Sequence, residues 1–474
     1  MLNAMAISIL MACISAQVDQ QGPAKNAPTA TQETPKPAEK KEPGLLSLSP
    51  EAAASDDSGP PRRGLPAPFQ SPPFPFSEFL GPTIGVPDTT PDYPLQKAFG
   101  PTKFGEFLKD NHIKLYGWVS PSFNLSTSHK SNTPTAYPLV PDRPELDQVV
   151  FVVERALDTV QTDHVDWGFH VLALYGIDYR YMLMKGFFSD QLLEKNNLYG
   201  GDIPEFDVRW YFPDVAEGMT LKIGRFISTP DIEACPTPVN YMFTHSIMFS
   251  YDPYSYMGVL ADIRLNQNWT VELGILGTND VALWDDSTKP NGHLMVRWVS
   301  DDNKDSFWGG INMLGEGKWE DFHDNLQHIV ATWTHKFNDE VHMSTEAYYM
   351  WQRDAFLGGS VNWGPVRRFG GGGGPGFFQP GLSDEWGAVH NLEIKLTDKD
   401  YLTIRNDFLR DDEGQRTGYR NTYSSHGIGW SHTVNELVTV RPELRYERGY
   451  NLPAYDNGTQ MDQFMFAIDL IVRF

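Results

Sequence analysis

Cysteine and basic side chains are scarce in this chain of 474 residues. It has 2 Cys, and 61 Asp and Glu outnumber 38 Lys and Arg, which gives a formal net charge of −23. Two cysteines exclude a multi-disulfide scaffold and a Cys-based zinc site. The acidic balance argues against nucleic acid as a partner, because phosphate binding needs clustered basic side chains. No run of about 18 apolar residues occurs, which excludes a helical membrane protein but leaves a membrane β-barrel open.

The first residues are typical of a secretory signal peptide. Ala4 to Ala16 form a short apolar stretch, so we expect residues 1–16 to be removed after export, although no Lys or Arg precedes the stretch. The sequence from Leu10 to Cys13 also resembles a lipoprotein signal, so lipidation at Cys13 stays open. Cleavage after Ala16 would leave Cys235 as the one thiol, which we expect to be buried and free.

Residues 17–104 have a different composition from the rest of the chain. They contain 18 of the 35 prolines, with ten acidic and eight basic residues. Such a segment buries too little apolar surface to fold, so we expect a disordered, semi-extended linker. It could contact the cell wall or serve as a simple tether.

From residue 105 the chain alternates apolar and polar residues with the period of a β-strand. The segments are longer than the average strand of a soluble protein, as expected of tilted strands that cross a bilayer. Sixteen such segments occur, at about 113–126, 147–159, 166–181, 204–212, 218–227, 256–266, 268–278, 291–301, 305–316, 324–337, 339–353, 386–397, 400–411, 418–433, 436–449 and 459–474.

The connections between these segments alternate between short and long, as do the periplasmic turns and extracellular loops of a transmembrane barrel. A soluble β-sandwich would show shorter strands and no such alternation. We therefore expect an all-β fold over 105–474, a transmembrane antiparallel up-and-down barrel of about 16 strands in the bacterial outer membrane. The final strand ends on Phe474, like the signal that barrel-assembly machinery recognises.

Aromatic side chains at strand ends predict the belts that lie at the two membrane interfaces. The general preference of aromatic residues for β-strands is the alternative explanation. The residues expected in the belts are Trp167, Tyr179, Tyr181, Trp210, Trp351, Trp386, Trp430 and Tyr446.

Several stretches resemble one known family, the second family of putative β-barrel porins of diderm bacteria. The resemblance lies in Ile113–Val119, Phe151–Arg155, Asp166–Tyr181 and Lys222–Phe226 with Glu233, Asn240 and His245 after them. It covers about 105–474 and excludes the proline-rich leader. The resemblance implies an outer-membrane channel but no particular solute.

Sixteen strands enclose a barrel wide enough for a water-filled channel. Alternating charges on inward faces would either set a transverse field for dipolar solutes or only form salt bridges along the wall. A slight acidic excess favours a mild cation preference. The expected pore-lining residues are Glu205, Asp207, Arg209, Asp262, Arg264, Glu393, Lys395, Arg405, Asp407, Arg441, Glu443, Arg445 and Glu447.

The third long loop, 228–255, occupies the position of the loop that narrows general porins. We expect it to form the constriction, with Asp231, Glu233 and His245 as its functional residues. The spacing of these three matches no compact metal site, so no metal or cofactor is expected. The glycine-rich loop 354–385 lacks the pattern of a phosphate-binding loop and is expected to be a mobile extracellular loop.

The sequence thus predicts a porin that lets small polar solutes diffuse through the outer membrane. It contacts membrane lipid, and a homotrimer is expected by analogy with other sixteen-stranded porins. One alternative is a non-conducting structural or adhesive barrel held to the cell wall by the N-terminal linker. An outer-membrane enzyme would need a pair such as His426 with Ser424 or Ser425, but no nucleophile motif surrounds them.

Overall fold

The computed structural model describes most of the chain after the proline-rich leader. It covers residues 84–88, 90–135, 137–189, 191–192, 197–320, 324–358 and 377–474. The expected signal peptide at 1–16, the lipidation candidate Cys13 and the linker up to residue 83 lie outside the described residues. So do the consecutive glycines of the expected mobile loop.

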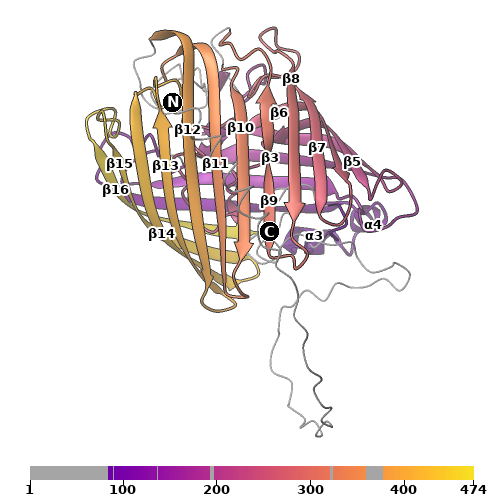
Figure 1. Cartoon of the computed structure of the whole chain (residues 1–474). Helices are drawn as coiled ribbons and strands as arrows, with labels where there is room; N and C mark the ends of the chain where they lie inside the picture. Colours follow the sequence, from indigo (N-terminus) through magenta and orange to yellow (C-terminus); the bar gives the residue numbers. More distant parts are fainter. Residues whose placement is uncertain are drawn as a thin grey trace, which may run out of the picture. The chain divides into compact units, whose positions relative to one another are not determined.

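Sixteen strands form one closed barrel in which each strand pairs with its neighbours in the sequence (Figure 1). The expectation of an up-and-down barrel is therefore confirmed. The strands are β1 (Lys114–Ser126), β2 (Pro144–Arg155), β3 (Asp166–Gly176), β4 (Gly200–Phe212), β5 (Met219–Ile227), β6 (Ser255–Arg264), β7 (Trp269–Leu276), β8 (Asn291–Val299), β9 (Asp305–Leu314), β10 (Gln327–Lys336), β11 (Val341–Phe356), β12 (Phe378–Lys395), β13 (Asp400–Asp411), β14 (Asn421–Asn435), β15 (Val438–Gly449) and β16 (Asp462–Arg473).

The barrel closes where the first strand meets the last. β1 pairs antiparallel with β16, with Phe123 opposite Ile468. Beyond the end of β16, the Phe474 backbone N–H donates to the Gly117 carbonyl at 2.9 Å, and the Gly117 N–H donates back at 3.1 Å. Closure leaves no unpaired strand edge, which a sheet in a lipid environment cannot tolerate.

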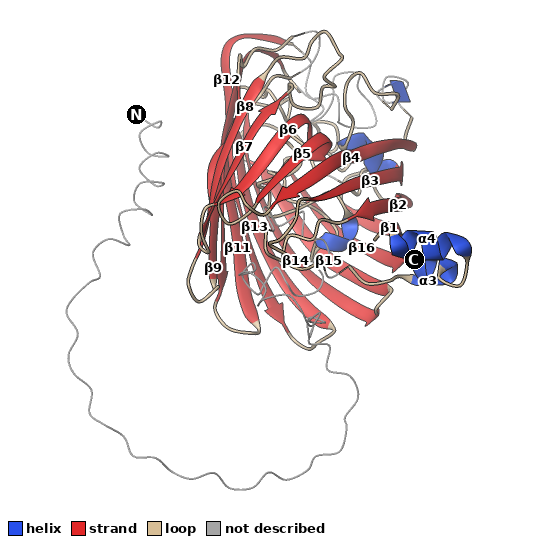
Figure 2. Cartoon of the chain, turned by 90° about the vertical axis from the view of Figure 1, so that its right-hand side faces the viewer, coloured by secondary structure: helices blue, strands red, loops and turns tan. Residues whose placement is uncertain are grey.

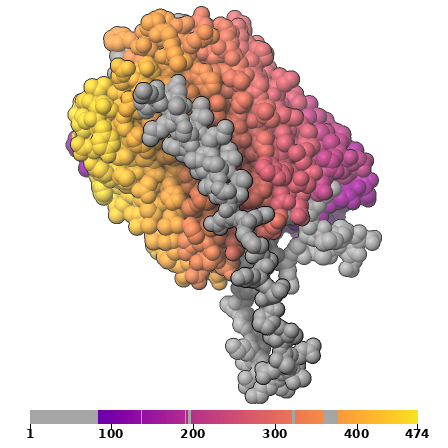
Figure 3. All heavy atoms as spheres, viewed as in Figure 1, coloured from indigo at the N-terminus to yellow at the C-terminus, as the bar shows by residue number. Residues whose placement is uncertain are grey.

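The two faces of each strand differ sharply in polarity. On β15, Arg445 and Glu447 point inward and are buried, whereas Leu444 and Tyr446 alternate with them and are exposed on the outside. Outward apolar side chains suit lipid, while inward polar ones need partners inside the barrel. Away from the grey atoms, Figure 3 shows the wall from β8 to β13 as continuous.

Two short helices precede the first strand, α3 (Pro94–Phe99) and α4 (Lys103–Asp110). The last part of the linker expected up to residue 104 is therefore helical. Local signals account for this, because Pro94 fits the first turn of α3 and the Thr102 hydroxyl caps α4 by accepting from Gly105 N at 3.0 Å. Both helices lie beside the C-terminus (Figures 1 and 2). Within the described ranges, no helix is long and apolar enough to cross a membrane.

The connections follow the expected alternation. The turns at one end of the barrel are 156–165, 213–218, 265–268, 300–304, 337–340, 396–399 and 436–437, and all of them except the first are shorter than every loop at the opposite end. The loop expected at 354–385 is shorter, because β11 and β12 extend beyond the wall together and pair Phe356 with Phe378.

The aromatic belt is only partly as expected. Trp167, Trp386, Trp430 and Tyr446 are exposed on the outer surface. Tyr179 and Tyr181 are buried instead, because β3 ends at Gly176 and the chain turns into the 3₁₀ helix η2 (Ile177–Tyr181). The strand therefore ends earlier than the alternating pattern, which continues to residue 181, had indicated.

Candidate functional site: the barrel interior

The loop between β5 and β6, residues 228–254, crosses the interior of the barrel. Gln148 Nε2 on β2 donates to the Cys235 carbonyl at 2.7 Å, and Thr229 Oγ1 donates to Glu272 on β7 at 2.7 Å. Tyr348 OH on β11 donates to the Met248 carbonyl at 3.2 Å. Because these strands belong to different sectors of the wall, a loop bonded to all of them must span the lumen.

Charged side chains on β13 and β15 hold this loop. Arg405 on β13 pairs with Glu233 at 2.9 Å between Nη1 and Oε1. Arg441 on β15 donates to the Asn240 carbonyl at 2.6 Å. The Glu443 carboxylate next to it accepts from the backbone N–H groups of Phe243 and Thr244, each at 3.1 Å. Charge-assisted bonds of this kind are stronger than neutral ones and fix the course of the loop.

His245 lies at the centre of an aromatic stack inside the barrel. Its ring centroid is 3.9 Å from that of Tyr137 and 4.6 Å from that of Phe249. Its Nε2 lies 2.7 Å from the Ala234 carbonyl, which a neutral ring can satisfy by donating. Burial lowers the pKa of His245 to about 3, so the ring is neutral at physiological pH.

Cys235 is a buried free thiol, as expected. The Tyr137 hydroxyl donates to its Sγ at 2.7 Å. Burial, together with nearby Asp178, raises the pKa of this thiol well above its ordinary value. The side chain therefore serves as a packing element between two loops.

The residues expected to line a pore all come from the inward side of their strands. Most of them are buried, and several contact loop 228–254, called the inserted loop below. Asp262 and Lys395 are half-buried, and Lys395 pairs at 2.7 Å with Asp398 in a short turn. The buried members are Glu205, Asp207, Arg209, Arg264, Glu393, Arg405, Asp407, Arg441, Glu443, Arg445 and Glu447.

Ion pairs neutralise part of this inward charge. Arg209 pairs with Asp207 on the same strand at 2.6 Å. Arg441 pairs across strands with Asp469 on β16 at 2.5 Å. Arg445 pairs with Glu447, its neighbour on β15. Salt bridging along the wall, one of the two readings of the alternating charges, therefore occurs at these positions.

Sequence reasoning missed two further loops that turn into the lumen. In the β1–β2 loop, Tyr137 and Leu139 are buried, and the Tyr137 ring stacks on Tyr181 of η2 with centroids 4.6 Å apart. Asp178 in η2 is also buried and accepts from Gln148 Nε2 at 2.8 Å. Apolar residues within long loops were the available signal, but they do not tell which way a loop folds.

The segment from Ile84 to Tyr93 lies across the end of the barrel that carries the short turns. The Ile84 carbonyl accepts from Arg264 Nη1 on β6 at 2.7 Å, and Gly85 N donates to Thr159 in the β2–β3 turn at 3.1 Å. Further along, Asp88 pairs with Lys114 on β1 at 2.9 Å. The segment therefore reaches from the β6 side of this mouth to the β1 side.

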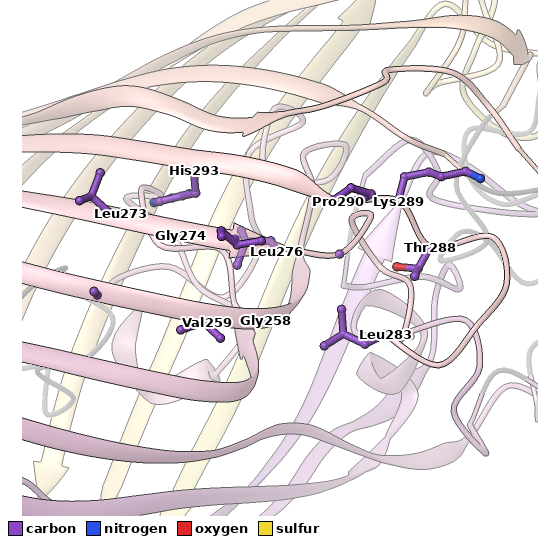
Figure 4. A pocket seen from close by; sticks show the side chains of 13 residues that line it. Gly258, Val259, Leu273, Gly274, Leu276, Leu283, Thr288, Lys289, Pro290 and His293 are labelled. Carbon is purple, nitrogen blue, oxygen red and sulfur yellow. The ribbon is translucent and has the colours of Figure 1, made fainter.

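Two cavities differ in position and character. A hollow of about 690 Å³ on the outer face is lined mainly by apolar residues of β6, β7 and the β7–β8 loop, among them Val259, Leu273 and Leu283 (Figure 4). A polar cavity of about 10 Å³ inside the barrel is lined by residues of the loop, such as Glu233, and of the wall, such as Glu393. A cavity of this size can hold at most about one water molecule, so the loop packs closely against the wall here.

The residues considered for an enzyme are not arranged as a catalytic pair. His426 Nδ1 lies 2.8 Å from Asn406 Oδ1 on the outer face. Ser425 is buried on the inner face, and the Ser424 hydroxyl bonds to Tyr450 OH at 3.0 Å. Neighbouring residues of a strand point to opposite faces, which separates Ser425 from His426.

Residues 112–474 match the family model described as "Putative beta-barrel porin-2, OmpL-like". The chain belongs to this porin family. It is a porin of the bacterial outer membrane rather than an enzyme. The match begins at the first strand and ends at Phe474, so it covers the whole barrel and excludes the leader.

Solved porin structures are also similar to this porin. An anion-selective porin from Comamonas acidovorans is 8% identical, covering 76% of this chain and 99% of that chain with a TM-score of 0.47. The outer membrane channel DcaP of Acinetobacter baumannii is 9% identical, with 76% and 97% covered and a TM-score of 0.47. OmpT of Vibrio cholerae is 10% identical, with 76% and 97% covered and a TM-score of 0.42. A comparison with curated proteins finds no match.

Proposed function

We propose that this porin is a narrow channel for small polar solutes and that loop 228–254 forms its constriction. The observation that carries the proposal is the course of the loop across the lumen, bonded to Gln148, Arg405 and Arg441 on different strands. A solute must pass between this loop and a wall of polar side chains. Such a passage favours small hydrophilic molecules over large or apolar ones.

The thirteen inward charged residues expected from the sequence would act on solutes that reach them. Rows such as Glu205 with Arg209, and Arg441 with Glu447, place opposite charges on one face of the wall. Such rows would orient dipolar solutes across the path. The slight acidic excess favours cations, which a reversal potential between two KCl concentrations would measure.

Conductance in planar bilayers tests the proposal. We expect stable, small conductance steps from the full chain and larger steps from a variant in which residues 236–246 are replaced by Gly-Ser-Gly. Arg448→Gln, on the exposed face of β15, is the control and should conduct like the wild type. A barrel that inserts but passes no ions would overturn the channel proposal. Equal steps from the wild type and the shortened loop would overturn the constriction.

A non-conducting structural or adhesive barrel is the second candidate. The observation that favours it is the close packing of the lumen, where Arg441 and Arg445 are each 1% exposed and Glu447 is 0% exposed. A wild type without conductance, with steps appearing only when the loop is shortened, would establish this candidate. Anchoring to the cell wall would then be tested by co-sedimentation of the full chain with purified peptidoglycan.

We also propose a homotrimer by analogy with other sixteen-stranded porins, and recognition of the Phe474 strand by the barrel-assembly machinery. Chemical cross-linking in native membranes tests the trimer. For the leader, we propose a signal peptide at 1–16 and a flexible linker before the ordered segment. N-terminal sequencing of the mature protein locates the cleavage, and incorporation of labelled palmitate would show lipidation at Cys13.

A further inference from the structure

Three carboxylates meet where the inserted loop leaves and rejoins the wall. Asp231 lies near the start of the loop, Asp252 near its end, and Glu346 on the inner face of β11. One carboxylate oxygen from each lies within 4.8 Å of the others. The residues are 8%, 5% and 2% exposed, so the cluster is shielded from bulk water.

Few donors reach the cluster: the Ser228 hydroxyl bonds to Asp231, and the Asp231 and Asp252 carboxyl groups can bond to each other when one of them is protonated. Neither carboxylate oxygen of Asp252 accepts a hydrogen bond, and the same holds for Oδ1 of Asp231. In Glu346, Oε2 accepts from the backbone N–H of Ile232 at 2.8 Å. Buried charged groups without partners are costly, so each such group calls for a missing ligand or a bound proton.

Two arginines that bond to the inserted loop have other partners. Arg416 donates to the backbone carbonyls of Tyr251 and Asp252 and pairs with Asp324. Arg405 pairs with Glu233. Arg416 attracts the Asp252 carboxylate at longer range, yet burial outweighs this attraction and raises the pKa of Asp252. Burial likewise raises the pKa of Asp231, to about 7.

We propose that Asp231, Asp252 and Glu346 bind one divalent cation, with Ca²⁺ as the preferred ion. Ligand oxygens lie about 2.3–2.6 Å from Ca²⁺, so oxygens around one ion are separated by up to about 5 Å, as these are. The donors are carboxylate oxygens, which favour Ca²⁺, Mg²⁺ or Mn²⁺ over metals that prefer nitrogen or sulfur. Ca²⁺ tolerates irregular geometry, whereas Mg²⁺ demands a near-ideal octahedron.

The bound ion would link both ends of the inserted loop to β11. Asp231 and Asp252 are separated by almost the entire loop, and Glu346 belongs to the wall. One ion held by all three therefore fixes the loop at its base, next to the contact from Ile232 N to Glu346. Cation binding does not require the barrel to conduct, so it stands apart from the proposed channel function.

Calorimetry on the full chain in detergent tests this site. The purified protein is treated with EDTA, desalted, and titrated with CaCl₂ and separately with MgCl₂ at pH 7.5. We expect one Ca²⁺ per chain in the wild type, with weaker binding of Mg²⁺. Asp252→Asn and Glu346→Gln should each weaken Ca²⁺ binding by about tenfold or more, since affinity depends on ligand charge. The control Glu385→Gln removes a buried carboxylate of β12 outside the cluster and should bind like the wild type.

Thermal unfolding distinguishes a variant that has lost the cation site from one that binds Ca²⁺ poorly because it is unstable. Ca²⁺ should raise the unfolding temperature of the wild type and of Glu385→Gln clearly more than that of Asp252→Asn. In EDTA, Asp252→Asn should be at least as stable as the wild type, because it removes one of three crowded carboxyl groups. Absence of saturable Ca²⁺ binding by the wild type overturns the proposal and leaves shared protons as the explanation. Equal Ca²⁺ affinity in all variants also overturns it.

Discussion

Arg405 and Glu233 belong to elements far apart in the sequence, yet their side chains meet inside the barrel. Their ion pair, at 2.9 Å, lies where a charge has little access to water. Arg405 also donates to the Thr244 hydroxyl at 2.8 Å, so one side chain holds the loop at two points. A buried pair of this kind matters mainly because neither partner can be removed alone without leaving an uncompensated charge.

Replacing Arg405 should destabilise the protein strongly. Arg405→Met leaves the Glu233 carboxylate buried without its cation, and the expected loss is about 3–5 kcal/mol of unfolding free energy. Urea unfolding followed by tryptophan fluorescence measures it. Arg410→Met is the matched control, because Arg410 pairs with Asp412 at 2.6 Å in an exposed position, where the expected loss is about 0–1 kcal/mol. Equal losses in the two variants would contradict the anchoring role of Arg405.

His245 should make stability depend on pH in the acid range. Its folded-state pKa of about 3 lies below its ordinary value of 6.5, so between these values the unfolded chain binds a proton that the folded chain does not. Stability is therefore lost as pH falls from 6.5 towards 3, by about 1.4 kcal/mol per pH unit. The difference between the unfolding free energies at pH 6.5 and pH 4.5 should be smaller in His245→Gln than in the wild type. The glutamine side chain keeps a donor for the Ala234 carbonyl.

Other groups titrate over the same range, so the comparison is between variants. The titration of Asp231 changes stability in the opposite direction. Its folded-state pKa is raised to about 7, so its contribution to the free energy of unfolding falls as pH rises above about 4. His164→Gln, an exposed histidine in the β2–β3 turn, is the control and should show the pH slope of the wild type. A slope in His245→Gln identical to that of the wild type would contradict a buried neutral imidazole.

At the scale of elements, the seam between β1 and β16 depends on one close contact. A Cβ at Gly117 would lie 2.1 Å from the Val150 carbonyl oxygen and 2.7 Å from Cζ of Phe474. Both distances are far below van der Waals contact, so only glycine lets the terminal ring lie over β1. The seam therefore joins the C-terminal residue to the first strand both by backbone pairing and by packing.

Gly117→Val should impair barrel closure. The side chain clashes with both β2 and the Phe474 ring, so the fraction of heat-modifiable, folded protein on a gel should fall severalfold. Phe474→Ala, which removes the ring but keeps the backbone pair, should have a smaller effect. Gly292→Ala on β8 is the control, since the nearest atom to its Cβ would be the Leu314 oxygen at 3.7 Å. Normal folding of Gly117→Val would show that the seam tolerates a side chain.

The sixteen paired strands, called the strand ladder below, form the barrel wall without the segment that lies across its mouth. The ladder runs from Lys114 to Arg473 without any contribution from the residues before it. The segment from Ile84 to Tyr93 is joined to that ladder through side chains and turns, such as the Lys114–Asp88 pair. Its removal should change access to the lumen without opening the barrel.

Deleting residues 17–93 should leave a folded barrel with a larger conductance. Barrel formation is measured by heat-modifiability and conductance in planar bilayers. Deleting residues 17–70 is the matched control, because this variant keeps the segment at the mouth and should conduct like the full chain. A barrel that fails to form without residues 17–93 would show that the ladder needs the leader. Unchanged conductance would show that the segment does not restrict passage.

Local patterns along the chain were enough to assign the strands and their order. Alternation of polarity and the length of connections are local properties, so all sixteen segments, the antiparallel order and the inward side of residues such as Arg441 could be read from them. Predicted strand ends were wrong where the alternating pattern continues beyond the end of a strand. Tyr179 and Tyr181 are an example, because they belong to η2 and are buried. The short helices before β1 were missed because the surrounding proline-rich composition outweighed their caps.

What fills the lumen depends on contacts between residues that are far apart in the chain. Whether a loop folds into the barrel depends on partners from many strands at once, such as Arg405 for Glu233 and Gln148 for Cys235. Such partners are spread over the chain and have no fixed spacing. For the same reason the sequence pointed to Asp231 beside Glu233 and His245, whereas the fold groups Asp231 with Asp252 and Glu346. Closure of the barrel brings these carboxylates together, and their proximity cannot be predicted from any local sequence pattern.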